Sequence, residues 1–246
     1  MRSEKAPADR PPLTTYEQLA KMIDHSLLRP QLTEQDVIQG CQVALRYRVA
    51  NVTVRPADVE LAVSLVQGSD VKVGTVAGFP HGSSTTATKL FETEDVLKRG
   101  AQEVDVVINI GRLLSRQFRY VEEEIRQITE LCHAYGAIVK IIFENAYLTD
   151  DLKIAACQMC KAAGADFAKT STGFAPSGAT LEDLRLMYKH CAPEVKVKAA
   201  GGVRTLEAAI QVYEVGCSRL GATATVEILE AWKRRLDQIA ACKPSG

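Results

Sequence analysis

Short apolar runs alternate along the chain with longer segments in which apolar residues recur at helical spacing. Several runs are apolar on both faces, which is typical of parallel strands covered by helices. The segments between them carry helix start signals, and Thr33-Glu-Gln-Asp36 matches a capping box. The runs predict eight strands, at residues 22–28, 49–54, 71–77, 103–110, 137–143, 166–170, 195–199 and 217–221.

Eight strand–helix units in 246 residues fit a closed barrel better than an open sheet. We therefore predict an α/β fold, a single (β/α)8 TIM barrel over residues 14–241. Residues 1–13 are polar and proline-rich and lack the apolar core of a signal peptide, so a flexible tail is expected there. Residues 242–246 are assigned to a C-terminal tail.

Charge and cysteine content narrow the class of protein. The 30 basic and 30 acidic residues balance, which argues against a nucleic-acid or membrane partner, because both need a basic surplus. The seven cysteines form no framework spacing, so reduced thiols and a cytoplasmic location are expected. Cys157 and Cys160 lie within a helical stretch, which favours packing over redox or zinc chemistry. No metal spacing appears among the histidines, and no metal is expected.

Four charged residues stand inside apolar strands, where an unpaired charge is costly. They are Asp24, Asp105, Lys169 and Lys198. The strands of such a barrel converge on one mouth, and the chemistry lies at their C-terminal ends. The pattern favours a functional site, with a structural network of ion pairs as the alternative.

The two lysines indicate a specific chemistry. Their predicted strands are neighbours, so Lys169 and Lys198 can approach and depress each other's pKa. A pKa lowered from about 10.4 towards 7 raises the neutral amine fraction roughly a thousandfold. Asp105 can then hold Lys198 charged and relay protons. This combination is what amine catalysis needs.

Glycine-rich turns follow the last three predicted strands. Exposed backbone N–H groups in such turns bind phosphate, and barrels commonly place a phosphate site after strands seven and eight. Tight turns without a ligand are an equally good interpretation of the pattern alone. The candidate phosphate-binding residues are Gly173, Gly201, Gly202, Arg204, Gly221 and Thr223.

From about Met22 to about Thr225 the chain resembles the deoxyribose-phosphate aldolases, which are class I aldolases. The resemblance rests on Ile23-Asp-His-Ser-Leu-Leu28, Glu103-Val-Asp-Val-Val-Ile-Asn109, Lys169-Thr-Ser-Thr-Gly-Phe174 and Lys198-Ala-Ala-Gly-Gly-Val-Arg-Thr205.

This resemblance implies reversible cleavage of 2-deoxy-D-ribose 5-phosphate to acetaldehyde and D-glyceraldehyde 3-phosphate, without a cofactor. It makes Lys169 the Schiff-base lysine, Lys198 the second active-site lysine and Asp105 the proton-transfer residue, with Asp24 in the same relay. Small aldehydes and sugar phosphates are the expected partners. A homo-oligomer, either a dimer or a tetramer, is expected.

The chain also departs from the pattern of some relatives. Some carry a phosphate-contacting lysine where Phe174 stands, and paired serines where Thr223 and Ala224 stand. We therefore expect a preference for the phosphorylated substrate that is smaller than in relatives bearing the lysine and both serines. Introducing Phe174→Lys should lower KM for that substrate.

Two other functions share the fold. A phosphosugar isomerase or cyclase would use acid–base carboxylates without an imine. A non-catalytic barrel would bind a sugar phosphate as a sensor. The fold alone cannot separate these alternatives from an aldolase.

Overall fold

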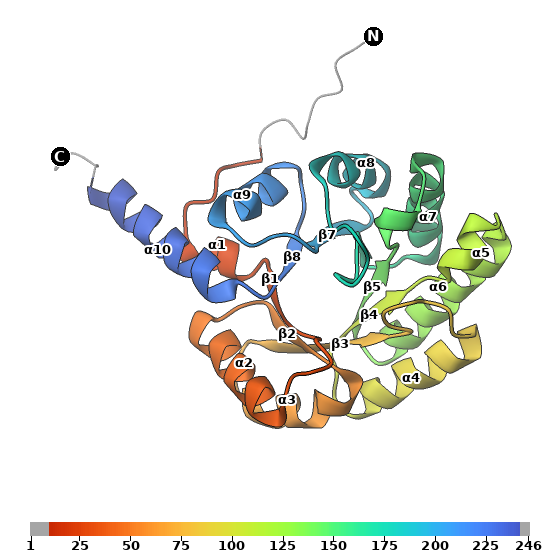
Figure 1. Cartoon of the computed structure of the whole chain (residues 1–246), viewed down its shortest axis with the longest axis horizontal. Helices are drawn as coiled ribbons and strands as arrows, with labels where there is room; N and C mark the ends of the chain where they lie inside the picture. Colours follow the sequence, from red (N-terminus) through yellow and green to blue (C-terminus); the bar gives the residue numbers. More distant parts are fainter. Residues whose placement is uncertain (1–9, 242–246) are drawn as a thin grey trace, which may run out of the picture.

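The computed structural model describes residues 10–241, which form a closed barrel of parallel strands ringed by helices (Figure 1). Each strand pairs with the next in chain order, and β1 pairs with β8 to close the barrel. This confirms the predicted (β/α)8 fold. The strands are β1 (Ile23–Leu27), β2 (Asn51–Val54), β3 (Lys72–Ala77), β4 (Glu103–Val107), β5 (Ile138–Ile142), β6 (Phe167–Lys169), β7 (Lys196–Ala200) and β8 (Arg219–Ala222).

The fourth strand is shorter than its apolar run. A strand was predicted to residue 110, but β4 ends at Val107. The Asn109 side chain accepts a hydrogen bond from the Arg112 backbone N–H at 3.1 Å and caps a short helix there. An N-cap asparagine therefore ends the strand although the next residues are apolar.

Threonine N-caps start several of the helices. The Thr33, Thr85, Thr180 and Thr205 side chains each accept a hydrogen bond from a backbone N–H three residues later. The predicted capping box at Thr33 is confirmed. The α-helices are α1 (Tyr16–Ala20), α2 (Glu34–Tyr47), α3 (Val59–Val66), α4 (Thr86–Lys98), α5 (Ile110–Leu114), α6 (Phe118–Ala134), α7 (Asp150–Ala163), α8 (Leu181–Cys191), α9 (Leu206–Glu214) and α10 (Thr225–Ala241), with 3-10 turns η1 (Pro56–Asp58) and η2 (Asn145–Tyr147).

A buried ion pair ties two outer helices to the end of β4. Lys89 on α4 lies 2.9 Å from Glu124 Oε1 on α6, and its Nζ also donates to the Val107 carbonyl at 2.7 Å. Both side chains are inaccessible to solvent. Burial lowers the pKa of Lys89, and the Glu124 carboxylate opposes that effect. This pair therefore fixes the helices that flank the β4 end of the barrel.

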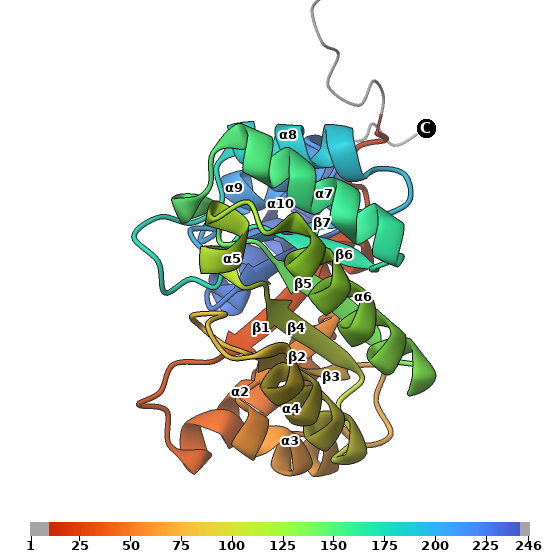
Figure 2. The ribbon, with the colours of Figure 1, turned by 90° about the vertical axis from the view of Figure 1, so that its right-hand side faces the viewer.

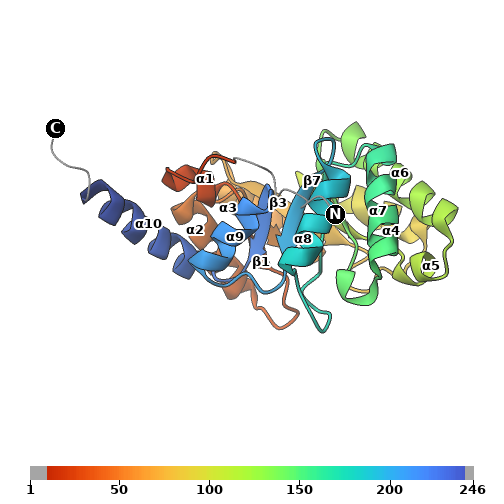
Figure 3. The ribbon, with the colours of Figure 1, turned by 90° about the horizontal axis from the view of Figure 1, so that it is seen from above.

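The last helix, α10, extends beyond the ring of helices around the barrel (Figures 1 and 3). Arg10 stacks at 4.0 Å from the centre of the Tyr213 ring and donates to the Tyr213 and Cys217 carbonyls. Part of the predicted N-terminal tail therefore contacts the barrel. Residues 1–9 and 242–246, which include the rest of both predicted tails, lie outside the described residues.

The predicted C-x-x-C pair is part of a helix core. Cys157 and Cys160 both lie on α7, fully buried, with free thiols. A hydrogen bond with the neighbouring Cys191, together with burial, raises the pKa of Cys157. These thiols therefore pack as small apolar groups. Within residues 10–241, no helix is both long and apolar enough to cross a membrane.

Two long connections project from the same side of the barrel. Figures 2 and 3 show the β1–α2 connection (residues 28–33) and the β6–α8 connection (residues 170–180) extending from that side. Because all strands are parallel, their C-terminal ends meet on this side. The side chains at those ends therefore share one mouth.

Candidate active site

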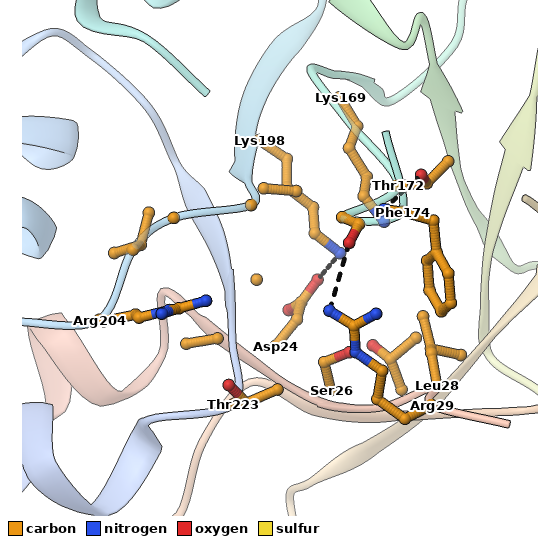
Figure 4. Close-up of a pocket in the computed structure, with 18 residues that line it drawn as sticks. Asp24, Ser26, Leu28, Arg29, Lys169, Thr172, Phe174, Lys198, Arg204 and Thr223 are labelled. Atoms are coloured by element: carbon orange, nitrogen blue, oxygen red, sulfur yellow. Dashed lines mark hydrogen bonds and ion pairs between the residues drawn. The ribbon is translucent and has the colours of Figure 1, made fainter. Parts of the chain in front are cut away.

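The four predicted catalytic residues come together inside the barrel, where Lys169 is the last residue of β6 and the other three lie within β1, β4 and β7. Lys169 on β6 and Lys198 on β7 are register partners, so their side chains enter the barrel side by side. Both amines donate to Oδ2 of Asp105 on β4, each at 2.7 Å. Asp24 on β1 forms a close ion pair with Lys198 (Figure 4). All four side chains are almost completely buried.

A pocket of about 130 Å³ opens above this cluster. Asp24, Lys169 and Lys198 line it, whereas Asp105 lies beneath them and is fully buried. The six predicted phosphate residues, from Gly173 to Thr223, line the same pocket. Catalytic and anion-binding candidates therefore face one small space.

The amine of Lys169 is perturbed in the direction that nucleophilic catalysis needs. Burial is the largest cause, and together with the positive charges of Lys198 and Lys140 it lowers the pKa of Lys169 to about 8. The Asp105 carboxylate opposes this shift. The sequence argument attributed the shift to Lys198. The structure shows that Lys198 acts in the expected direction but that burial contributes more.

Both aspartates are held as anions. Burial alone would raise the pKa of Asp105, but Lys140, Lys169 and Lys198 surround it and hold that pKa well below its usual range. Burial would likewise raise the pKa of Asp24, yet the cations beside it lower that pKa to about 2. Each acid is therefore ionised at neutral pH because buried cations outweigh its burial.

Sequence reasoning missed Lys140 on β5, which is a third buried lysine in contact with Asp105. Its Nζ lies 2.7 Å from Asp105 Oδ1 and 2.7 Å from Glu103 Oε2. Contact with these carboxylates more than offsets burial and raises the pKa of Lys140 well above its usual value. The signal was present, because Lys140 interrupts the apolar run Ile138–Ile142 as the other candidates interrupt theirs.

A second charged layer lies below the four predicted residues. Arg219 on β8 pairs with Glu103 Oε1 at 2.9 Å and contacts Asp24. Asn51 on β2 donates to Glu103. The structure therefore contains both a reactive cluster at the mouth and a network of ion pairs beneath it. The lower layer compensates the buried charges of the upper one.

The pocket wall requires two glycines in close contact. A Cβ on Gly178 would lie 2.3 Å from the Gly201 carbonyl oxygen, and Gly201 itself has a φ of 80°. The Ala179 N–H donates to the Ala200 carbonyl at 3.0 Å. The β6–α8 connection is thereby held against the turn after β7, which brings the glycine turns together.

A buried glutamate anchors the other end of that connection. Glu144 follows β5 in a left-handed conformation with a φ of 59°, and burial raises its pKa. Its carboxylate accepts hydrogen bonds from the Thr172 N–H and Oγ1. Thr172 Oγ1 in turn accepts a hydrogen bond from the Phe174 N–H at 3.0 Å. Sequence reasoning did not assign Glu144 to the site, although a strained non-glycine residue often marks one.

A histidine next to Asp24 has a structural contact. The His25 ring contacts Thr225 Oγ1 at 2.8 Å, which joins β1 to the start of α10. Burial lowers the pKa of His25 to about 4, so the ring is neutral at pH 7. Among residues 10–241, no group of three or more histidine, cysteine or acidic side chains is placed to hold a metal ion.

Comparison with known proteins identifies the family. The model of the DeoC/LacD family aldolases matches residues 19–243. A deoxyribose-phosphate aldolase from Clostridium perfringens is 48% identical over 214 residues, covering 87% of this chain and 95% of that protein.

Two solved structures share the fold closely. A putative deoxyribose-phosphate aldolase from Coccidioides immitis is 37% identical with a TM-score of 0.86, covering 90% of this chain and 88% of that one. The deoxyribose phosphate aldolase from Aeropyrum pernix, described as a unique tetrameric structure, is 33% identical with a TM-score of 0.84, covering 90% and 93%. The chain therefore belongs to the DeoC/LacD family of aldolases.

Proposed function

We propose that this protein is a class I aldolase that reversibly cleaves 2-deoxy-D-ribose 5-phosphate to acetaldehyde and D-glyceraldehyde 3-phosphate. The observation that carries the proposal is the buried Lys169 amine at the pocket floor, with a pKa of about 8. Family membership and the shared site pattern support the same substrate. Lys169 is the proposed Schiff-base residue.

The lowered pKa makes the Lys169 amine a usable nucleophile at neutral pH. With a pKa of about 8, about a tenth of the amine is neutral at pH 7. An ordinary lysine, with a pKa near 10.5, is neutral in only about three molecules in ten thousand. The site therefore raises the reactive fraction about 300-fold, which is the activation that a lysine nucleophile needs.

The proposed synthesis begins when the neutral Lys169 amine attacks the carbonyl carbon of acetaldehyde to give a carbinolamine, whose hydroxyl group takes up a proton and leaves as water to give an iminium ion. The methyl carbon then loses a proton, and its electron pair forms an enamine. The enamine carbon attacks the aldehyde carbon of glyceraldehyde 3-phosphate, and the aldehyde oxygen takes up a proton. Water hydrolyses the new iminium ion and frees Lys169.

Asp105 and Lys198 are the proposed proton-handling pair. Asp105 Oδ2 contacts both amines at 2.7 Å, so one oxygen lies between the nucleophile and the second lysine. As a carboxylate it accepts a hydrogen bond from Lys198, which lines the pocket and is the proposed proton donor. Asp24 contacts Lys198 and is proposed to complete this relay.

The phosphate is proposed to bind at the glycine turns. Gly201 and Gly202 have positive φ values and, together with Arg204, line the pocket after β7. Backbone N–H groups in such turns form anion sites. Gly173, Gly221 and Thr223 line the same pocket and complete the proposed set.

Trapping the imine tests this function directly. The protein is incubated with acetaldehyde and borohydride, and the modified lysine is located by mass spectrometry. We expect an ethyl adduct on Lys169, and no adduct in Lys169→Met. A matched Lys72→Met variant, which removes an exposed lysine at the start of β3, should keep the adduct.

The alternatives predict other results. Turnover of a sugar phosphate without any adduct would support an isomerase or cyclase and overturn the aldolase assignment. Binding of sugar phosphate with neither adduct nor turnover would support a non-catalytic barrel.

We further propose that the protein works as a homo-oligomer in the cytoplasm. The tetrameric Aeropyrum pernix relative supports an oligomer, and the six described cysteines, all buried with free thiols, are compatible with a reducing compartment. Light scattering after size-exclusion chromatography distinguishes a monomer, which would contradict the proposal, from a dimer or tetramer.

A further inference from the structure

Arg29, in the connection between β1 and α2, faces the same pocket as Lys169 and Lys198. Its Nη2 donates to the Gly173 carbonyl at 3.3 Å, and its Cζ lies 4.6 Å from the centre of the Phe174 ring. Figure 4 shows the guanidinium beside Phe174 and Arg204 on another side of the pocket. Sequence reasoning did not assign Arg29 to the site and did not predict its contact with Phe174.

The position of Arg29 is supported by packing. The Phe174 ring meets Phe79 edge to face, with centroids 5.3 Å apart and an interplanar angle of 88°. The Phe174 backbone is fixed through Thr172 to the buried Glu144. The loops after β1, β3 and β6 therefore meet at this point. A guanidinium on an aromatic face keeps its N–H edge free to bind a ligand.

Most N–H donors of the Arg29 guanidinium make no hydrogen bond to the described part of the chain. Within residues 10–241, no carboxylate forms an ion pair with Arg29 or Arg204, whereas Arg219 in the barrel interior pairs with two. Arg29 uses one of its five N–H groups in the hydrogen bond to the Gly173 carbonyl. Two arginines that line one pocket without a carboxylate partner are suited to an anionic ligand.

Arg29 also lies next to the glycine turns. Gly173, whose carbonyl it contacts, packs against the turn after β7, since a Cβ on Gly201 would lie 3.8 Å from Gly173 Cα. An anion at these turns is therefore beside the Arg29 guanidinium. Arg204 follows the same β7 turn and lines the pocket from its other side.

We propose that Arg29 is a specificity-determining residue that binds the phosphate of the sugar substrate, with Phe174 as the platform that orients it. The assignment rests on the proposed aldolase function and adds a residue to it. Arg29 and Arg204 hold the phosphate between them, while the glycine turns supply backbone donors. Because Arg29 selects the charged end of the substrate, it has no part in imine formation at Lys169.

The test compares kcat/KM for 2-deoxyribose 5-phosphate and for 2-deoxyribose in the parent and in Arg29→Gln. We expect about a tenfold loss with the phosphorylated substrate, because one solvent-exposed charge-assisted contact is removed. The unphosphorylated substrate should change by less than about twofold. Arg29→Lys should recover part of the loss, and Phe174→Leu should give a smaller loss of the same kind.

Arg46→Gln is the matched control. Arg46 is exposed on α2 and also stacks on an aromatic ring, that of Tyr47 at 5.6 Å, but it does not line the pocket. Both substrates should be turned over by this variant as by the parent.

The outcomes separate this assignment from the proposed function. Equal changes for the two substrates in Arg29→Gln would overturn the phosphate role while leaving the aldolase intact. A parent that shows neither turnover nor a trapped imine would overturn the aldolase function and, with it, the role of Arg29. A borohydride adduct on Lys169 of Arg29→Gln shows that the loss lies in substrate selection.

Discussion

Replacing Lys198 with methionine should raise the pKa of Lys169. Both amines lie 2.7 Å from the same Asp105 oxygen, so they are separated by at most twice that distance. Two positive charges about 5 Å apart repel by about 3 kcal/mol at an effective dielectric constant of about 20. This energy corresponds to about two pKa units. The variant also leaves Asp105 with one cation fewer to share, which stabilises protonated Lys169 further.

Water screens part of this repulsion, so we expect an increase of about one to two pKa units. The neutral amine is the nucleophile, and imine formation therefore rises with pH until the pKa of Lys169 is passed. The parent should reach half of its maximal rate near pH 8. The variant should reach it between about pH 9 and pH 10.

The assay is the initial rate of reductive trapping with acetaldehyde, from about pH 6 to about pH 10.5, with the Lys169 adduct quantified by mass spectrometry. Lys72→Met, which removes an exposed lysine, should follow the parent. A thermal melt verifies that Lys198→Met is folded. A folded variant whose midpoint coincides with that of the parent would show that Lys198 does not contribute to the lowered pKa of Lys169.

Three further predictions test other titratable side chains of the barrel. Lys89→Met should lower the free energy of unfolding in urea by about 3–5 kcal/mol, because it leaves Glu124 buried and unpaired, while kcat stays unchanged; a loss below about 1 kcal/mol would contradict this. Asp105→Asn should move the trapping midpoint to lower pH, because the carboxylate raises the pKa of Lys169, and an upward shift would refute that sign. The His25 pKa, near 6.5 in the unfolded chain, is about 4 in the fold, so the unfolded state binds the extra proton between these values. The parent should therefore lose about 3 kcal/mol from His25 as pH falls from about 6.5 to about 4; urea unfolding of His25→Gln should lack this increment, and equal slopes would exclude it.

The barrel could be predicted because the amino-acid pattern of each strand indicates by itself that the strand is buried on both faces. Apolar runs on both faces mark strands covered by helices, and this signal is local to each run. The same logic found Asp24, Asp105, Lys169 and Lys198, since a charge in an apolar run is visible in the sequence. It could also have found Lys140, which stands in an equally apolar run.

The contacts between these charges could not be predicted in the same way. Whether Asp105 touches Lys169, Lys198 or Lys140 depends on the register of strands that are distant in sequence. The relative weight of burial and charge in the pKa of Lys169 depends on the same geometry. Arg29 is a further case, because it lies in a loop whose sequence has no periodicity and gains its role from Phe174, far along the chain.

Phe174 shows how this affects a prediction about substrate range. From the sequence, an aromatic residue there removes a cation, and Phe174→Lys should lower KM for the phosphorylated substrate. In the structure the ring carries the Arg29 guanidinium at 4.6 Å, so the cation reaches the pocket from another loop. A lysine at position 174 would remove that platform and place an ammonium group beside the guanidinium, and like charges repel. We therefore expect Phe174→Lys to leave KM for 2-deoxyribose 5-phosphate unchanged or higher. A lower KM for this substrate, with 2-deoxyribose unaffected, would show that position 174 binds the phosphate independently of Arg29.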